Sequence, residues 1–85
     1  MANVVVYSTD YCPYCIRARA LLDKKDINYQ LIDVAHDDAL RQEMMTKSGR
    51  HTVPQIFIND TPIGGCDDLF ALNESGQLDK LLKEG

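Results

Sequence analysis

Two cysteines separated by two residues, Cys12 and Cys15, lie between a run of β-branched residues and a segment with helical periodicity. The run at 4–7 is typical of a buried strand, so the pair falls where a strand passes into a helix. At a helix N-terminus, unpaired N–H groups and the helix dipole favour a thiolate over a thiol. Pro13 suits the first helical turn, where the N–H that proline lacks would have no partner. We therefore expect an exposed, nucleophilic Cys12 and a more buried, resolving Cys15.

Two other interpretations of the cysteine pair fit the sequence less well. A zinc site needs about four ligands, but the chain has one such pair, a single further cysteine at Cys66, and two distant histidines, His36 and His51. A purely structural disulfide would close a very short loop, which gains little from closure entropy. The pair is therefore expected to be redox-active, and no metal is expected.

Size and charge restrict the class of protein. The 85 residues are enough for one domain, spanning 1–85. The net charge of −4, from 9 basic and 13 acidic residues without a basic run, argues against nucleic-acid binding. No apolar stretch approaches the length of a membrane span. The N-terminal residues lack the pattern of a signal peptide, so a reducing cytoplasm is the expected compartment, in agreement with an odd number of cysteines.

The hydrophobic pattern predicts four short strands. They are expected at 3–7, 29–34, 55–58 and 61–64. Asn59-Asp60 is typical of a tight hairpin turn between the last two strands. A helix between the first two strands makes that pair parallel. Pro62 cannot donate a ladder hydrogen bond, so the last strand is expected at an edge of the sheet.

Three helices are expected between and after these strands, in the order β-α-β-α-β-β-α. The first covers 13–25, the second is capped by Asp37 and closed by Gly49, and the third follows Gly64-Gly65, with a last turn or two beyond Gly76. The apolar residues expected to face the sheet are Ile16, Ala18, Ala20, Leu21 and Leu22 in the first helix and Leu40, Met44 and Met45 in the second. This order predicts an α/β fold with one four-stranded mixed sheet and helices on both faces. The cysteine pair would lie at the C-terminal end of the first strand.

Three motifs in this order resemble the dithiol glutaredoxins, most closely the small bacterial type. The motifs are Cys12-Pro13-Tyr14-Cys15, Thr52-Val53-Pro54 and Gly64-Gly65-Cys66-Asp67-Asp68, and the likeness spans essentially the whole chain. Thioredoxins differ by a tryptophan before the first cysteine, and this chain has no tryptophan. The resemblance implies a thioredoxin-like fold and a monomer that performs glutathione-dependent thiol–disulfide exchange. Glutathione would be the reductant, and disulfide-bonded or glutathionylated proteins would be the substrates.

The resemblance also implies a glutathione-binding site. Its residues would be Tyr14, Arg41, Thr52, Val53, Pro54, Gly65, Cys66, Asp67 and Asp68. The Val53-Pro54 bond would be cis, against the base rate for such bonds, and the Val53 backbone would pair with an extended cysteinyl segment. The N–H groups of Cys66 and Asp67 would hold the γ-glutamyl carboxylate, and Asp67 or Asp68 would meet the adjacent ammonium.

Several of these residues have a second interpretation. Asp67 and Asp68 also suit simple helix capping, which is compatible with binding. Arg41 is either a contact for the glycine carboxylate of glutathione or a solvated surface residue. Tyr14 either covers the ligand or fills surface. Cys66 is either a small buried hydrophobe or an oxidisable third thiol.

One departure from the common pattern bears on ligand binding, and one alternative function is implied by the family. Many relatives carry a lysine where this chain has Thr9, followed by Asp10, which removes one charge that would hold the ligand. The alternative function implied by the family is an iron–sulfur cluster carrier, with Cys12 and glutathione as ligands in a dimer. Pro13 stiffens the position that is usually small in such carriers and counts against this alternative.

Overall fold

The computed structural model describes residues 3–9 and 11–84, so Asp10 lies outside the described residues. The strands are β1 (Val4–Ser8), β2 (Gln30–Asp33), β3 (Gln55–Ile58) and β4 (Thr61–Gly64). They form one sheet in the order β2-β1-β3-β4. β1 pairs parallel with β2 and antiparallel with β3, and β4 is antiparallel to β3. The predicted mixed sheet is confirmed, with the Pro62 strand at an edge.

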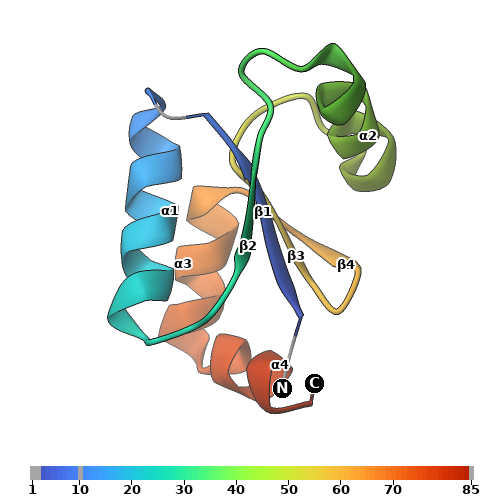
Figure 1. Ribbon diagram of the computed structural model, residues 1–85. Helices are drawn as coiled ribbons and strands as arrows, with labels where there is room; N and C mark the ends of the chain where they lie inside the picture. The colour runs from blue at the N-terminus through green and yellow to red at the C-terminus, as the bar shows by residue number, and fades with distance from the viewer. Residues whose placement is uncertain (1–2, 10, 85) are drawn as a thin grey trace.

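The helices cover both faces of this sheet, as predicted. α1 (Pro13–Lys24), α3 (Cys66–Ser75) and α4 (Gln77–Glu84) lie on one side, and α2 (Asp38–Ser48) lies on the other (Figure 1). The predicted ends of α2 are confirmed: the Asp37 side chain accepts a hydrogen bond from the Leu40 N–H at 3.0 Å, and Gly49 closes the helix with a φ of 73°. Within the described segments, no helix is both long and apolar enough to cross a membrane.

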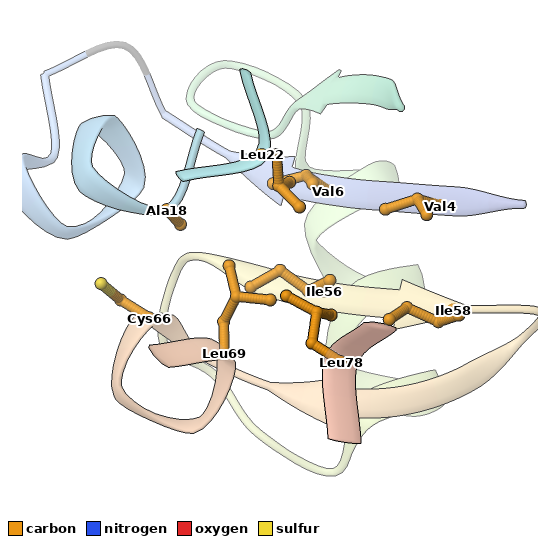
Figure 2. Packing of buried hydrophobic residues seen from close by; sticks show 9 residues of the cluster. All are labelled: Val4, Val6, Ala18, Leu22, Ile56, Ile58, Cys66, Leu69 and Leu78. Atoms are coloured by element: carbon orange, nitrogen blue, oxygen red, sulfur yellow. The ribbon is translucent and has the colours of Figure 1, made fainter. Parts of the chain in front are cut away.

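The alternation of side chains along the strands divides the core into two clusters. The cluster beneath α1 and α3 contains Val4, Val6, Ala18, Leu22, Ile56, Ile58, Cys66, Leu69 and Leu78 (Figure 2). The cluster beneath α2 contains Tyr7, Val34, Met44 and Phe57. Because neighbouring strand residues point to opposite faces, Val6 and Tyr7 belong to different clusters. The sheet thereby fixes the position of the end of β1, and the segment that leads to Cys12 begins there.

The buried face of α1 differs from the predicted one. Ile16 is 48% exposed and Ala20 is also exposed, whereas Cys15, Ala18 and Leu22 are completely buried. Those three residues are spaced by three and four positions and share one side of the helix. Cys15 therefore occupies a core position, and the prediction that Ile16 and Ala20 face the sheet was wrong.

Candidate active site

Cys12 is the N-cap residue of α1. Its backbone is extended, with φ −84° and ψ 117°, and its C=O accepts the first helical hydrogen bond from the Ile16 N–H at 3.1 Å. Pro13 occupies the first turn, as predicted. No side chain caps this helix, and its first turn contains no acidic residue. The positive end of the helix dipole is therefore available to the Cys12 sulfur.

The two sulfurs have different environments. Cys12 is partly exposed, whereas Cys15 is 0% exposed, and both are free thiols. The pKa of the Cys15 thiol is raised to about 11, chiefly by burial and also by the neighbouring Cys12, while Thr9 opposes the shift. The predicted difference in burial is therefore present, and it leaves Cys15 protonated near neutral pH.

A proline loop distant in sequence faces the first cysteine. The Val53-Pro54 peptide bond is cis, as the family resemblance implied. The Cys12 thiol donates to the Val53 C=O across 3.8 Å. The Gln55 amide donates to the Thr52 C=O at 3.0 Å and braces the loop from β3. The loop therefore presents the Val53 backbone beside the Cys12 sulfur.

A cleft of about 290 Å³ opens next to this loop. It is lined by Tyr14, Arg50, Thr52, Val53, Pro54, Gly65, Cys66, Asp67 and Asp68. All the predicted binding residues are among them except Arg41, which lies on α2 and is not part of the lining. The arginine of the cleft is instead Arg50, which sequence reasoning missed. The sequence signal that could have indicated Arg50 as a cleft residue is its position two residues before the Thr52-Val53-Pro54 motif.

Arg50 belongs to a network that joins two sides of the cleft. Its Nη1 donates to Asp68 Oδ2 at 2.8 Å, and the same oxygen accepts the Gly65 N–H at 3.0 Å. The Gly65 N–H, followed by the Arg50 side chain, lowers the pKa of the Asp68 carboxyl. The N-cap residue of α3 is Gly65, and the predicted capping of this helix by an aspartate is provided by Asp68, but not from the N-cap position. Asp68 instead reaches back from the first turn, a position from which a side chain can satisfy the N-cap N–H.

The glycine pair lets backbone segments approach closely. A Cβ on Gly65 would lie 3.3 Å from the Pro54 C=O, which is closer than ordinary packing. The proline loop and the start of α3 are thus in contact across the cleft. Cys66, at the first position of α3, is 3% exposed, and burial raises the pKa of its thiol. It both packs in the core and lines the cleft.

The remaining predicted residues lie at the surface. Tyr14 is 54% exposed at the mouth of the cleft. His36 and His51 are exposed, as expected. Over residues 3–9 and 11–84, no group of three or more His, Cys, Asp or Glu side chains is arranged to hold a metal ion.

Comparison with known proteins identifies the family. The glutaredoxin family model matches residues 4–63, which is more than half of the chain. The chain belongs to the glutaredoxin family. Glutaredoxin 3 of Escherichia coli strain K12 is 54% identical over 83 residues, covering 98% of this chain and 100% of that protein. The predicted resemblance to the small bacterial type is confirmed.

Solved glutaredoxin structures have the same fold. The solution structure of the Brucella melitensis glutaredoxin superposes with a TM-score of 0.86 at 51% identity, covering 98% of this chain and 90% of that one. The buckwheat glutaredoxin–glutathione complex gives a TM-score of 0.90 at 35% identity, covering 98% and 78%. The predicted thioredoxin-like fold is confirmed. As a glutaredoxin, this protein is a thiol–disulfide oxidoreductase that uses glutathione as its reductant.

Proposed function

We propose that Cys12 is the nucleophile and Cys15 the resolving thiol of this glutaredoxin. The observation that carries the proposal is their unequal placement: Cys12 is partly exposed at the start of α1, and Cys15 is fully buried one turn later. A thiolate is the attacking form of cysteine, and a helix N-terminus stabilises it. The Cys12 thiolate attacks the mixed disulfide between glutathione and a substrate. The Cys12–glutathione disulfide forms, and the substrate leaves as a thiolate that takes a proton from water.

Two routes complete the cycle. A second glutathione thiolate attacks the Cys12–glutathione disulfide, which releases oxidised glutathione and restores Cys12. When the substrate is a protein disulfide, Cys12 is instead left linked to the protein. Cys15 then attacks the Cys12 sulfur, forming the Cys12–Cys15 disulfide and releasing the reduced protein. Two glutathione molecules then reduce this disulfide in successive exchanges, which restores both thiols and releases oxidised glutathione.

The cleft beside Cys12 is proposed to hold glutathione. The Val53 backbone, with Thr52 and Pro54, pairs with the cysteinyl segment as an added strand. Gly65 permits the close approach of the ligand backbone. The N–H groups of Cys66 and Asp67, in the first turn of α3, bind the γ-glutamyl carboxylate.

The ammonium group of glutathione is assigned to Asp67 rather than Asp68. Asp68 Oδ2 already accepts hydrogen bonds from Gly65 and Arg50, so much of its charge is compensated. Asp67 is exposed on the lining of the same cleft. Arg50 therefore supports the γ-glutamyl end indirectly through Asp68. Arg41 remains proposed for the glycine carboxylate, and Tyr14 for covering the ligand.

The protein substrates are proposed to be disulfide-bonded and glutathionylated proteins, reduced by a monomeric enzyme. A cleft open at the surface beside a partly exposed sulfur suits large substrates. The reaction is expected in the cytoplasm, where glutathione keeps thiols reduced.

Separate assays of the two routes test the proposal. C15S should retain much of its activity on glutathione mixed disulfides but lose the reduction of protein disulfides. C12S should lose both activities. Circular dichroism and urea unfolding of each variant control for folding. Normal activity of C12S on a glutathione mixed disulfide would refute the assignment.

A further inference from the structure

Thr9 is a buried polar residue that the proposed mechanism has not used. It follows β1 directly and is 2% exposed. Its Oγ1 has no hydrogen-bond partner within the described part of the chain. Buried hydroxyl groups in folded proteins nearly always have a partner, because leaving one unpaired costs stability. A buried, unpaired hydroxyl at Thr9 is therefore expected to have a function that offsets this cost.

The group beside Thr9 is the Cys15 thiol. The main chain of Thr9 and, to a smaller extent, its hydroxyl lie close enough to this sulfur to lower its pKa, although the hydroxyl makes no hydrogen bond to the neutral thiol. Burial raises the pKa of the Cys15 thiol, and so does the facing Cys12, which is the ionisable group that acts on it. Arg17 and Asp67 act instead on the neighbouring Cys66. The groups that favour a charged Cys15 sulfur thus belong to Thr9, which lies between the end of β1 and Cys12.

The resolving step needs a thiolate at this buried position. Cys15 must lose its proton before its sulfur can attack the Cys12 sulfur of a mixed disulfide. A buried charge without a hydrogen-bond donor is strongly disfavoured. A neutral thiol, by contrast, is a weak acceptor and leaves a nearby hydroxyl essentially unpaired.

We propose that Thr9 is a positioning residue for the resolving step, whose hydroxyl is held unpaired beside the Cys15 thiol and donates a hydrogen bond to the sulfur once it is a thiolate. The proposal rests on the assignment of Cys15 as the resolving thiol and deepens it. The Cys15 proton passes to solvent, the Cys15–Cys12 bond forms, and the Cys12–substrate bond breaks. The substrate thiolate leaves and is protonated by water. Thr9 itself gains and loses no proton.

The test is single-turnover kinetics of the resolving step as a function of pH. Reduced protein is mixed with a disulfide-bonded protein, and release of the substrate thiol is followed by stopped flow in wild type, T9V and T9S. T9V removes the hydroxyl while keeping a branched side chain, and T9S retains the hydroxyl. A hydrogen bond to a charged group is worth about a tenfold change in rate. We therefore expect T9V to slow release about tenfold and to move its pH profile upward, and T9S to restore both.

A second background separates this role from a structural one. In C15S, turnover of a glutathione mixed disulfide does not use Cys15, so adding T9V should bring no further loss. Equal resolving rates and pH profiles for wild type and T9V would overturn the proposal. A loss in T9V that is just as large in the C15S background would also overturn it, since the hydroxyl would then act on Cys12 or on the fold. If C15S itself still resolved protein mixed disulfides, the underlying assignment of Cys15 would fail instead.

Discussion

Replacing Gly64 by alanine should break the network that organises the γ-glutamyl side of the cleft. Gly64 is buried at the end of β4 and has a φ of +115°, a conformation that side chains rarely adopt. A Cβ there would overlap Asp68 Oδ2 and would lie 2.7 Å from Asp68 Cγ and 2.9 Å from Asp68 Cβ. The Asp68 carboxylate would have to move away from the Gly65 N–H and from Arg50.

Two costs add in this variant. Holding alanine at this φ costs about 1–3 kcal/mol of backbone strain. Losing a hydrogen bond to a charged group costs about 1.5–3 kcal/mol, and the lower end applies because the Asp68 side chain is 44% exposed. We therefore expect G64A to lower the free energy of unfolding by about 3–4 kcal/mol. The KM for a glutathionylated substrate should also rise, because the start of α3 loses a constraint.

Gly49 provides a matched control for this prediction. It also has a positive φ, +73°, but a Cβ there would meet no atom within 4 Å. G49A should therefore show strain alone, about 1–2 kcal/mol, with an unchanged KM. Urea unfolding gives the free energies, and steady-state deglutathionylation gives the KM values. Equal losses of stability in G64A and G49A would show that displacement of Asp68 adds no cost beyond backbone strain, and would refute this prediction.

Three further predictions follow from burial, packing and charge. Because burial raises the Cys15 pKa to about 11 from 9.0, the folded state keeps a proton that the unfolded chain loses. The associated stability, up to about 3 kcal/mol, should be complete below pH 9 and lost towards pH 11 in urea unfolding of reduced protein. C15A should weaken this dependence and leave the part that comes from the buried Cys66 thiol. L69A, at a fully buried core position, should cost about 3 kcal/mol of unfolding free energy, whereas L31A, 43% exposed, should cost less than about 1 kcal/mol. R50Q should raise the KM for a glutathionylated substrate about threefold at low salt and less at high salt, since exposed ion pairs are weak and screened.

The order of elements and the place of the cysteine pair could be predicted because their signals are local. The β-branched run of β1, Pro13 in the first turn of α1, and Gly49 after α2 each specify backbone conformation through their own chemistry. The edge position of β4 followed from Pro62 alone. These features need no knowledge of contacts between distant segments.

The features that were missed depend on contacts between segments distant in sequence, or on a residue with two roles. Arg50 pairs with a carboxylate 18 positions away, and nothing in its neighbours indicates that partner. Cys15 was expected to be more buried than Cys12 but was not counted in the apolar face of α1, where Ile16 was placed instead. Thr9 was interpreted as an absent lysine, and its burial beside Cys15 emerged only from the packing of the active-site loop.

The central claim is that a helix N-terminus makes Cys12 the reactive sulfur of the three. Reduced protein should be treated with limiting iodoacetamide near neutral pH, and the label at each cysteine measured over time by peptide mass spectrometry. We expect Cys12 to be alkylated at least about tenfold faster than the buried Cys15 and Cys66, and faster than cysteine in a short peptide. Alkylation of Cys12 no faster than that of the short peptide, or preferential labelling of Cys15 or Cys66, would contradict it.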